Sequence, residues 1–309
     1  MRTTKFSFQS TPWKLALVWT VSLGAFWRPL VVLVKLALQD DRYSHLLLIP
    51  FVTIFLIYLD RQRIFEERRW APRLGIPLFA LAIMVYWVAK PWSMWKEADD
   101  RLWLPALALV LVWVSAFLFM NGPKAAAAAI FPLCFLLLMV PVPSVFLDRA
   151  TYALQKGSAD LTDVLFRIFG MPVYRSGFKF ALPGINIEVA KECSGIRSSL
   201  ALLITGLLAS HLFLRSTARK VFFVLLTIPV AIFKNAVRIV TLSFMGVYVD
   251  RAWLDSPLHR RGGALFALLG LAILLPILMW LRRSEAAPGD SQPPVPIREQ
   301  ADPPIAAAN

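Results

Sequence analysis

Long apolar runs follow one another along most of the chain and are separated by short polar or basic segments. A helix that spans a bilayer needs about 20 mostly apolar residues, and eight runs come near that length or exceed it. They cover residues 13–38, 45–59, 74–89, 102–120, 125–142, 193–214, 221–246 and 262–281. This pattern predicts an all-α polytopic membrane protein with about eight transmembrane helices.

The connection from Pro143 to Glu192 is the longest one between these runs, and it has a pattern of its own. Apolar residues recur at helical spacing from 147 to 168 with charged residues between them, which predicts an amphipathic helix at the membrane interface. From 178 to 189 apolar and polar residues alternate around Pro183-Gly184, which predicts a small β-hairpin. The predicted hairpin leads to Cys193.

Composition agrees with a membrane protein and excludes an ordinary soluble domain. Of the 309 residues, 58% are hydrophobic and only 17% are charged, against about 25% charged in soluble domains. The net charge of +14 would suggest nucleic-acid binding in a soluble protein. In a polytopic protein, however, basic residues gather in cytoplasmic loops and near anionic lipid. We therefore expect membrane lipid and no nucleic acid among the partners.

The basic residues also predict how the chain crosses the membrane. If the N-terminus is inside, the inner connections hold roughly twice as many lysines and arginines as the short outer ones, which favours two cytoplasmic termini. The connection 143–192 then lies on the outer side. We expect a transmembrane domain, 1–283, followed by a disordered Pro/Ala-rich cytoplasmic tail, 284–309.

The two cysteines lie in different settings. They are too few and too far apart in sequence for a disulfide framework or a zinc cluster, and we expect no metal and no cofactor. Cys134 lies inside an apolar run and is expected to pack there. Cys193 lies where the predicted hairpin ends and a span begins. The unpaired N–H groups of that helix start, with Arg197 one turn on, favour a reactive thiolate.

A second group of polar residues lies inside the run 221–246. Lys234 and Arg238 place two cations in a spanning segment, which is costly and usually marks function or a buried partner. Asn235 shares a helix face with Arg238. For Lys234, snorkelling or a structural pair with Glu192 or Asp255 is an alternative of equal weight to a functional role.

Histidines supply the third candidate. His259 precedes the last run, and an imidazole with an ordinary pKa near 6.5 serves as both general base and general acid. His45 lies at a predicted outer helix start, where Ser44 is a candidate N-cap. In the predicted topology Cys193, Arg238 and His259 meet at the outer face. These are the groups needed for acyl transfer through a thioester.

Taken together, these segments resemble the exosortase/archaeosortase family. The similarity rests on 188–198, which contains Glu192-Cys193-Ser194-Gly195, on 235–239 and on His259 with Gly263. Tyr43-Ser44-His45 and Leu182-Pro183-Gly184 are similar to further motifs of the family, so the resemblance covers about 40 to 281. Archaeal relatives are similar but have arginine at the position of His259, so the histidine favours a bacterial exosortase-like protein.

The resemblance implies a cysteine protease or transpeptidase in the bacterial cytoplasmic membrane, with its active site at the outer face. Its substrates would be exported proteins with a C-terminal sorting signal of the Pro-Glu-Pro type, cleaved through a thioester and passed to a cell-surface acceptor. Cys193 would be the nucleophile, His259 the proton shuttle and Arg238 the oxyanion stabiliser. The residues expected to support catalysis or bind substrate are Glu192, Ser194, Arg197, Asn235 and His45.

Two other classes of function remain open from the sequence. A polytopic transporter would use charged residues of the spans as a transport site. A membrane acyltransferase would use the same thiol on lipid or polysaccharide precursors. The acceptor that resolves the thioester, whether water, lipid or polysaccharide, and the oligomeric state also remain open.

Overall fold

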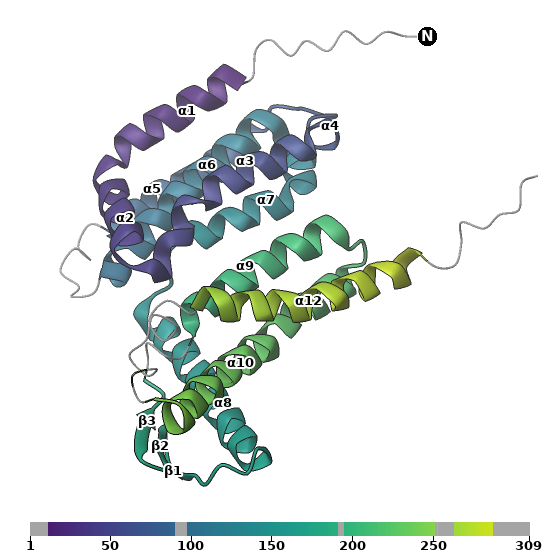
Figure 1. Ribbon diagram of the computed structural model, residues 1–309. Helices are drawn as coiled ribbons and strands as arrows, with labels where there is room; N and C mark the ends of the chain where they lie inside the picture. The colour runs from purple at the N-terminus through teal and green to yellow at the C-terminus, as the bar shows by residue number, and fades with distance from the viewer. Residues whose placement is uncertain (1–11, 90–97, 191–194, 251, 253–262, 287–309) are drawn as a thin grey trace, which may run out of the picture.

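The computed structural model describes residues 12–89, 98–190, 195–250, 252 and 263–286, and it is mostly helical with one small sheet (Figure 1). The helices before the sheet are α1 (Pro12–Ala25), α2 (Trp27–Gln39), the 3-10 helix η1 (Asp41–Leu47), α3 (Ile49–Leu59), α4 (Arg61–Ile64), α5 (Pro72–Ala89), α6 (Ala98–Ala128), α7 (Ile130–Phe135), the 3-10 helix η3 (Leu136–Met139) and α8 (Ser144–Ile168). Those after it are α9 (Ile196–Phe213), α10 (Thr217–Tyr248) and α12 (Gly263–Ala286).

Six stretches of described helix are long and apolar enough to cross a membrane. They are Arg42–Leu59, Pro72–Ala89, Asp100–Ala128, Ile196–Phe213, Thr217–Tyr248 and Leu265–Glu285. A seventh is added if Ile130–Met139 and Ser144–Ile168, which meet at a bend of 93°, count as one broken span. The chain is therefore a multi-pass helical protein, but the predicted count of eight is not confirmed. The difference arises at two of the predicted runs.

The first run, 13–38, forms two helices instead of one. α1 has 14 residues and α2 has 13, and each is shorter than the roughly 20 residues that a span needs. The break lies at Phe26. Pro29 follows in the first turn of α2, where it has no N–H to donate to the carbonyl of Ala25. Proline is tolerated in a first helical turn but interrupts a continuous helix.

The fourth and fifth runs, 102–120 and 125–142, meet at a kink. α6 continues to Ala128 across Gly122, whose φ is +82°, so the fifth run contributes only α7 and η3 before the chain bends into α8. A Cβ at Gly122 would collide with the carbonyl of Arg69. The N–H groups of Arg69 and Ala71 donate to the carbonyls of Asn121 and Phe119. Glycine therefore allows the connection between α4 and α5 to lie directly on this kink.

The sheet lies where the hairpin is predicted and has one strand more. Its antiparallel order is β1 (Tyr174–Ser176), β2 (Lys179–Leu182) and β3 (Ile185–Glu188). Gly184, in the Pro-Gly turn between β2 and β3, has a φ of +77°, which suits the third position of a type II turn. Phe180 is buried against Phe166 of α8, whereas its neighbours Lys179 and Ala181 are exposed. The sheet thus turns one face toward α8.

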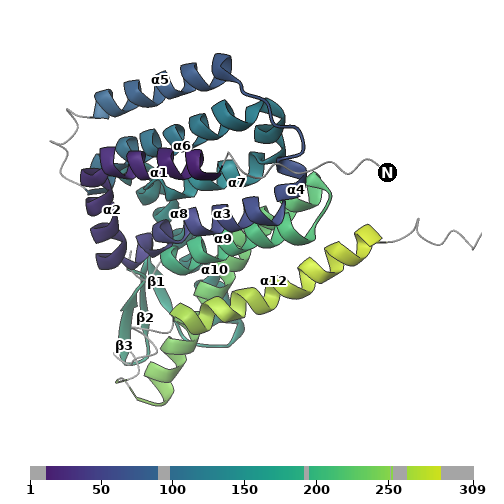
Figure 2. The same ribbon diagram turned by 90° about the horizontal axis from the view of Figure 1, so that it is seen from above.

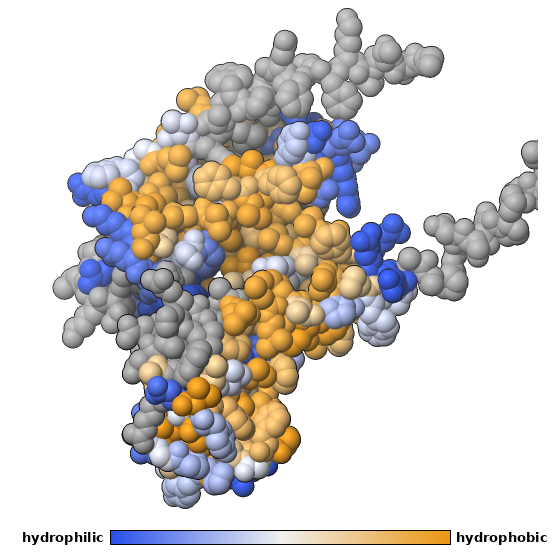
Figure 3. All heavy atoms as spheres, viewed as in Figure 1, coloured by the Kyte–Doolittle hydropathy of each residue, from blue (hydrophilic) through white to orange (hydrophobic). Residues whose placement is uncertain are grey.

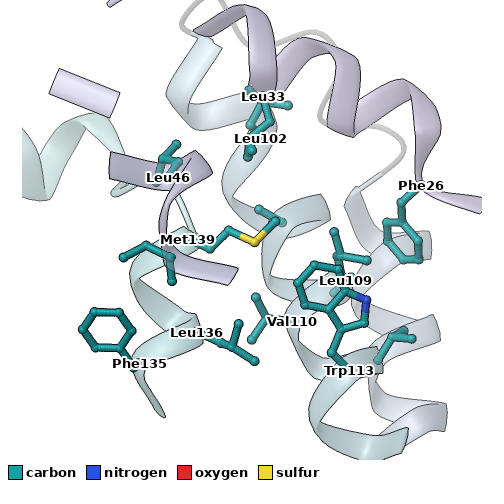
Figure 4. Packing of buried hydrophobic residues seen from close by; sticks show 14 of the residues in the cluster. Phe26, Leu33, Leu46, Leu102, Leu109, Val110, Trp113, Phe135, Leu136 and Met139 are labelled. Atoms are coloured by element: carbon teal, nitrogen blue, oxygen red, sulfur yellow. The ribbon is translucent and has the colours of Figure 1, made fainter. Parts of the chain in front are cut away.

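The helices form two adjoining bodies (Figure 1 and Figure 2). α1 to α7 make up the first, and its core includes Leu46, Leu109, Trp113 and Met139 (Figure 4). The indole N–H of Trp113 donates to Ser22 Oγ at 2.8 Å, so the polar atom of this buried ring is satisfied. In the second body α10 packs against α8, α9 and α12. The sheet lies beside α8 and α10 and shares an apolar cluster with them.

The two ends of the helical bundle differ in polarity. The start of α1, α4 and the end of α12 lie at one end (Figure 1 and Figure 2). Hydrophilic residues gather there, next to a broad apolar surface (Figure 3). Exposed arginines at this end are Arg61, Arg63, Arg69, Arg282 and Arg283. η1 and the start of α9 lie at the opposite end of the bundle (Figure 1).

Candidate functional site

α10 carries a group of polar residues near its middle. Lys234 and Asn235 are only 1% and 2% exposed, and Arg238, one turn further along, is half-buried. Because α10 is packed between three other helices, Lys234 and Asn235 lie inside the protein. The Nζ of Lys234 donates to Ser198 Oγ of α9 at 2.6 Å. Snorkelling, one of the alternatives that the sequence left open for this lysine, is therefore wrong.

The start of α9 lies directly beside Asn235. Gly195 precedes the helix and has a left-handed backbone with a φ of +74°, which glycine adopts at little cost. A Cβ at this position would come within 2.9 Å of Asn235 Oδ1. Ser198, in the first turn of α9, donates its hydroxyl proton to the carbonyl of Gly195 at 3.1 Å. α10 therefore contacts the beginning of α9 through two consecutive residues, Lys234 and Asn235.

α8 contributes a polar stripe that sequence reasoning missed. Its buried residues include Thr151, Gln155, Ser158 and Thr162, and their spacing places them on one helix face. Asn235 Nδ2 donates to Ser158 Oγ at 3.1 Å. Gln155 Nε2 donates to the carbonyl of Val189, just after β3. The pattern of the sequence predicts the amphipathic helix, but the side buried in the protein includes this uncharged polar stripe.

η1 brings the N-terminal half of the chain against α9. Its N-cap is Asp40 and not Ser44, because the Asp40 carboxylate accepts the backbone N–H of Arg42 at 2.9 Å and binds the Arg42 guanidinium at 2.6 and 2.8 Å. Burial opposes ionisation of Asp40, but the hydrogen bonds from Arg42 outweigh it and hold the pKa of the carboxyl below its ordinary value. The charge of Arg197 lowers the pKa further. His45 lies in this same short helix and is half-buried.

Four of the residues predicted for the site lie outside the described residues: Glu192, Cys193, Ser194 and His259. In sequence, Cys193 is three residues before α9 and His259 is four before α12. The two helices meet in their second turns, since a Cβ at Gly270 of α12 would lie 3.2 Å from Leu202 Cδ2 of α9. Their N-terminal ends therefore lie side by side (Figure 1 and Figure 2).

Cys134 is not packed in the interior, contrary to the prediction from the sequence. It is a free cysteine that lies exposed in α7, because the buried face of this short helix is formed by Pro132, Leu133 and Phe135. Near it, His211 of α9 stacks on Phe131 with ring centroids 3.6 Å apart. Among residues 12–89, 98–190, 195–250, 252 and 263–286, no three His, Cys, Asp or Glu side chains cluster closely enough to hold a metal ion.

The described part of this region is suited to stabilising negative charge. The first turn of a helix carries the positive end of the helix dipole. Arg197 lies in that turn of α9, and Lys234 and Arg238 lie one turn apart on the neighbouring α10. Such surroundings favour a thiolate over a thiol and favour the oxyanion of a tetrahedral intermediate.

A comparison with protein families gives one match. The family described as transmembrane exosortase matches residues 27–276, from the start of α2 into α12. The matched region includes Asp40, Ser158, Gly195, Ser198 and the Lys234–Arg238 segment. Neither the curated proteins nor the solved structures give a match.

Proposed function

The chain belongs to the transmembrane exosortase family, and on this premise we propose that it is a membrane-embedded cysteine protease or transpeptidase that cleaves the C-terminal sorting signal of exported proteins. Family membership supports a membrane protease or transpeptidase in broad terms. The observation that carries the more specific proposal is the contact between Asn235 and Gly195. It places the cationic segment of α10 at the helix start that follows Cys193 in sequence.

In the proposed reaction Cys193 is the nucleophile and His259 moves the proton. The imidazole takes the thiol proton as sulfur attacks the scissile carbonyl, which forms a tetrahedral oxyanion. Collapse of this intermediate breaks the C–N bond, and the imidazolium gives its proton to the leaving amine. The product is a thioester between Cys193 and the exported protein. An acceptor, either water or a nucleophile at the cell surface such as a lipid or polysaccharide group, then displaces the sulfur.

Arg238 is proposed to stabilise the oxyanion. Arginine keeps its charge at all physiological pH values and presents several N–H donors in a planar fork. A donor that is already fixed before the reaction costs no reorganisation when the charge develops. α10 supplies this rigidity. Asn235 shares a helix face with Arg238 and donates a hydrogen bond to Ser158 of α8. Arg197, Glu192, Ser194 and His45 are proposed to support catalysis or bind the substrate.

The proposed location is the bacterial cytoplasmic membrane, with both termini in the cytoplasm and the site at the outer face. This orientation is supported by the exposed arginines at the end of the bundle where α1 begins and α12 ends, since basic residues favour the cytoplasmic side. The start of α9 lies at the opposite end (Figure 1). A sorting signal there would be accessible after export of the substrate.

The test is cleavage of an exported reporter protein that ends in a Pro-Glu-Pro motif, an apolar segment and a basic end. Cys193→Ala should insert into the membrane at normal abundance and leave the reporter uncleaved, whereas Cys134→Ala should cleave it normally. Cys193→Ser should be severely impaired, because a hydroxyl lacks an accessible anion at neutral pH. Full cleavage by Cys193→Ala would overturn the thiol mechanism.

Mass spectrometry of the new C-terminus identifies the acceptor in the same experiment. A free carboxylate indicates hydrolysis, and an added mass indicates transfer to a nucleophile. An acyltransferase acting on lipid or polysaccharide precursors would instead leave the reporter intact and require Cys193 for lipid or glycan modification. A transporter would leave the reporter intact and would not need the thiol at all.

A further inference from the structure

Lys234, the buried lysine of α10, has no role in the proposed reaction. Lys234 is 1% exposed, and its positive charge is repelled by that of Arg238 one helical turn away. Placing a cation inside a spanning segment is costly unless a partner or a function offsets it. Among the described residues its hydrogen-bond partner is a neutral hydroxyl, that of Ser198; Glu192 and Asp255, the alternative structural partners, lie outside the described residues. An apolar side chain of similar length would fill the same space without the cost of burying a charge.

The stem of Lys234 crosses a junction of three helices. Its Cδ lies 3.2 Å from the place that a Cβ on Gly270 of α12 would occupy, and Leu202 of α9 lies at the same distance from that place. Glycine at position 270 therefore leaves the room through which the lysine stem passes between α9 and α12. The ammonium group reaches the first turn of α9, where it meets Ser198.

The hydrogen bonds run in one direction along this chain of groups. The Ser198 hydroxyl has a single proton, which it donates to the carbonyl of Gly195, so its oxygen accepts from Lys234 Nζ. A lysine that activates a serine nucleophile must instead accept the hydroxyl proton. The observed direction therefore argues against a serine–lysine pair. A charged donor also strengthens the bond that the hydroxyl itself donates.

The carbonyl that receives this bond belongs to the residue that starts α9. On a second side Gly195 packs closely against Asn235, whose amide donates to Ser158 of α8. Two adjacent residues of α10 thus restrict the same backbone unit, Lys234 through the hydroxyl of Ser198 and Asn235 by close packing. In sequence this unit lies two residues after Cys193.

We propose that Lys234 is a positioning residue for the thiol chemistry: through Ser198 it fixes the carbonyl of Gly195, and with it the start of α9 that follows Cys193. This inference rests on the proposed function of Cys193 as a nucleophile. Lys234 acts through the other two residues and does not itself touch the substrate.

The test uses the full-length protein in membranes, in a Cys134→Ala background so that Cys193 is the single thiol. Lys234→Met keeps the length of the stem and removes the charge and the donor. Ser198→Ala removes the hydroxyl through which Lys234 acts. Ser210→Ala is a matched control, because Ser210 of α9 also donates to the carbonyl three residues before it, at 2.8 Å, and is at least as well buried as the half-buried Ser198. Lys35→Met removes an exposed lysine of α2 and controls for net charge.

Three quantities are measured: membrane abundance, the rate of reporter cleavage, and the pH profile of Cys193 alkylation by iodoacetamide. Lys234→Met and Ser198→Ala should keep near-normal abundance and each lose about tenfold or more in cleavage rate, while both controls stay at the wild-type rate. Lys234→Met should also move the alkylation profile to higher pH, which a purely structural role would not do. The double variant should lose no more than Lys234→Met alone, because both residues act through one chain of bonds.

A Lys234→Met protein with the wild-type cleavage rate and alkylation profile would overturn the proposal, as would fully additive losses in the double variant. If Lys234→Met does not accumulate in the membrane, Ser198→Ala decides: cleavage equal to that of Ser210→Ala overturns the inference. Normal cleavage by Cys193→Ala would overturn the proposed function instead. The alkylation profiles would still test the link between Lys234 and the thiol in that case.

Discussion

Replacing Gly195 by alanine measures how tightly α10 holds the start of α9. A left-handed backbone costs a residue with a Cβ about 1–2 kcal/mol, and Gly195 has a φ of +74°. The new Cβ would lie 2.9 Å from Asn235 Oδ1 and 3.0 Å from its Cγ, so the buried amide has to move. Its bond to Ser158 is 3.1 Å long, and leaving a buried polar group without its partner costs about 1–3 kcal/mol. The two contributions predict a loss of about 2–5 kcal/mol in the free energy of unfolding.

Gly177→Ala separates the backbone contribution from the contact with Asn235. Gly177, between β1 and β2, also has a positive φ, +63°, but a Cβ there would have nothing within 4 Å. This control should therefore lose only the backbone contribution. The difference between the two variants, about 1–3 kcal/mol, is the part due to displacement of Asn235.

The assay is equilibrium unfolding in detergent micelles, accompanied by reporter cleavage for each variant. Gly195→Ala should be less stable than Gly177→Ala and should lose cleavage, while Gly177→Ala should cleave normally. Adding Asn235→Ala to Gly195→Ala removes the amide that meets the new methyl group, so the losses of the two single variants should not add. Equal stabilities of Gly195→Ala and Gly177→Ala, or additive losses in the double variant, would refute the reasoning.

Catalysis, acid stability and membrane orientation can each be tested separately. Arg238→Lys keeps the charge but loses the planar fork, so it should insert normally and lose about 10²–10³ in cleavage rate; a parallel loss of protein and cleavage would show a structural pairing instead. Arg42 holds the pKa of Asp40 low against the effect of burial, so the stabilisation by this carboxylate is complete above its ordinary pKa of about 4 and is lost as the pH falls through the lowered value. The temperature of thermal unfolding should therefore fall in acid, and Asp40→Asn should show a flatter dependence of that temperature on pH; parallel pH profiles of the two proteins would contradict this. Reporter fusions after Arg69 and at the C-terminus should read as cytoplasmic and a fusion after Lys96 as external, and an external Arg69 would reverse the proposed orientation.

The apolar pattern predicts the long helices because a helix in lipid must satisfy its backbone internally and show apolar side chains all round. α5, α9, α10 and α12 all lie where the runs predict them. Hydropathy alone does not predict where such a run breaks. The first run is apolar on both sides of Arg28-Pro29 and therefore predicts one span, although the helix is interrupted at Phe26, just before that pair. The fifth is shortened by the bend before α8, which depends on packing inside the protein.

The polar residues of the site were predictable only where they are unusual for their surroundings. Asn235 and Arg238 stand out because an amide and a cation are rare inside an apolar run. Ser158, Gln155 and Ser198 do not stand out, since hydroxyl and amide groups are common in interface helices and first turns. They gain a role only when another segment of the chain places a donor or an acceptor within hydrogen-bond distance. Asp40 was missed for the same reason, because its relation to Arg197 comes from the packing of η1 on α9.

The way α10 is held explains how a membrane protein can fix such a site without a large driving force between helices. Lipid tails are as apolar as leucine, so helices in a bilayer associate through close packing and polar bonds. Each neighbour of α10 turns one glycine toward it: Gly157 of α8 faces Ile232, Gly206 of α9 faces Thr227 and Gly270 of α12 faces Lys234. These three close approaches set the spacing of the helices. The hydrogen bonds of Lys234 and Asn235 fix the positions of α9 and α8 along the axis of α10. The same contacts determine where α9 and α12 lie relative to each other, and Cys193 and His259 precede these two helices in sequence by three and four residues.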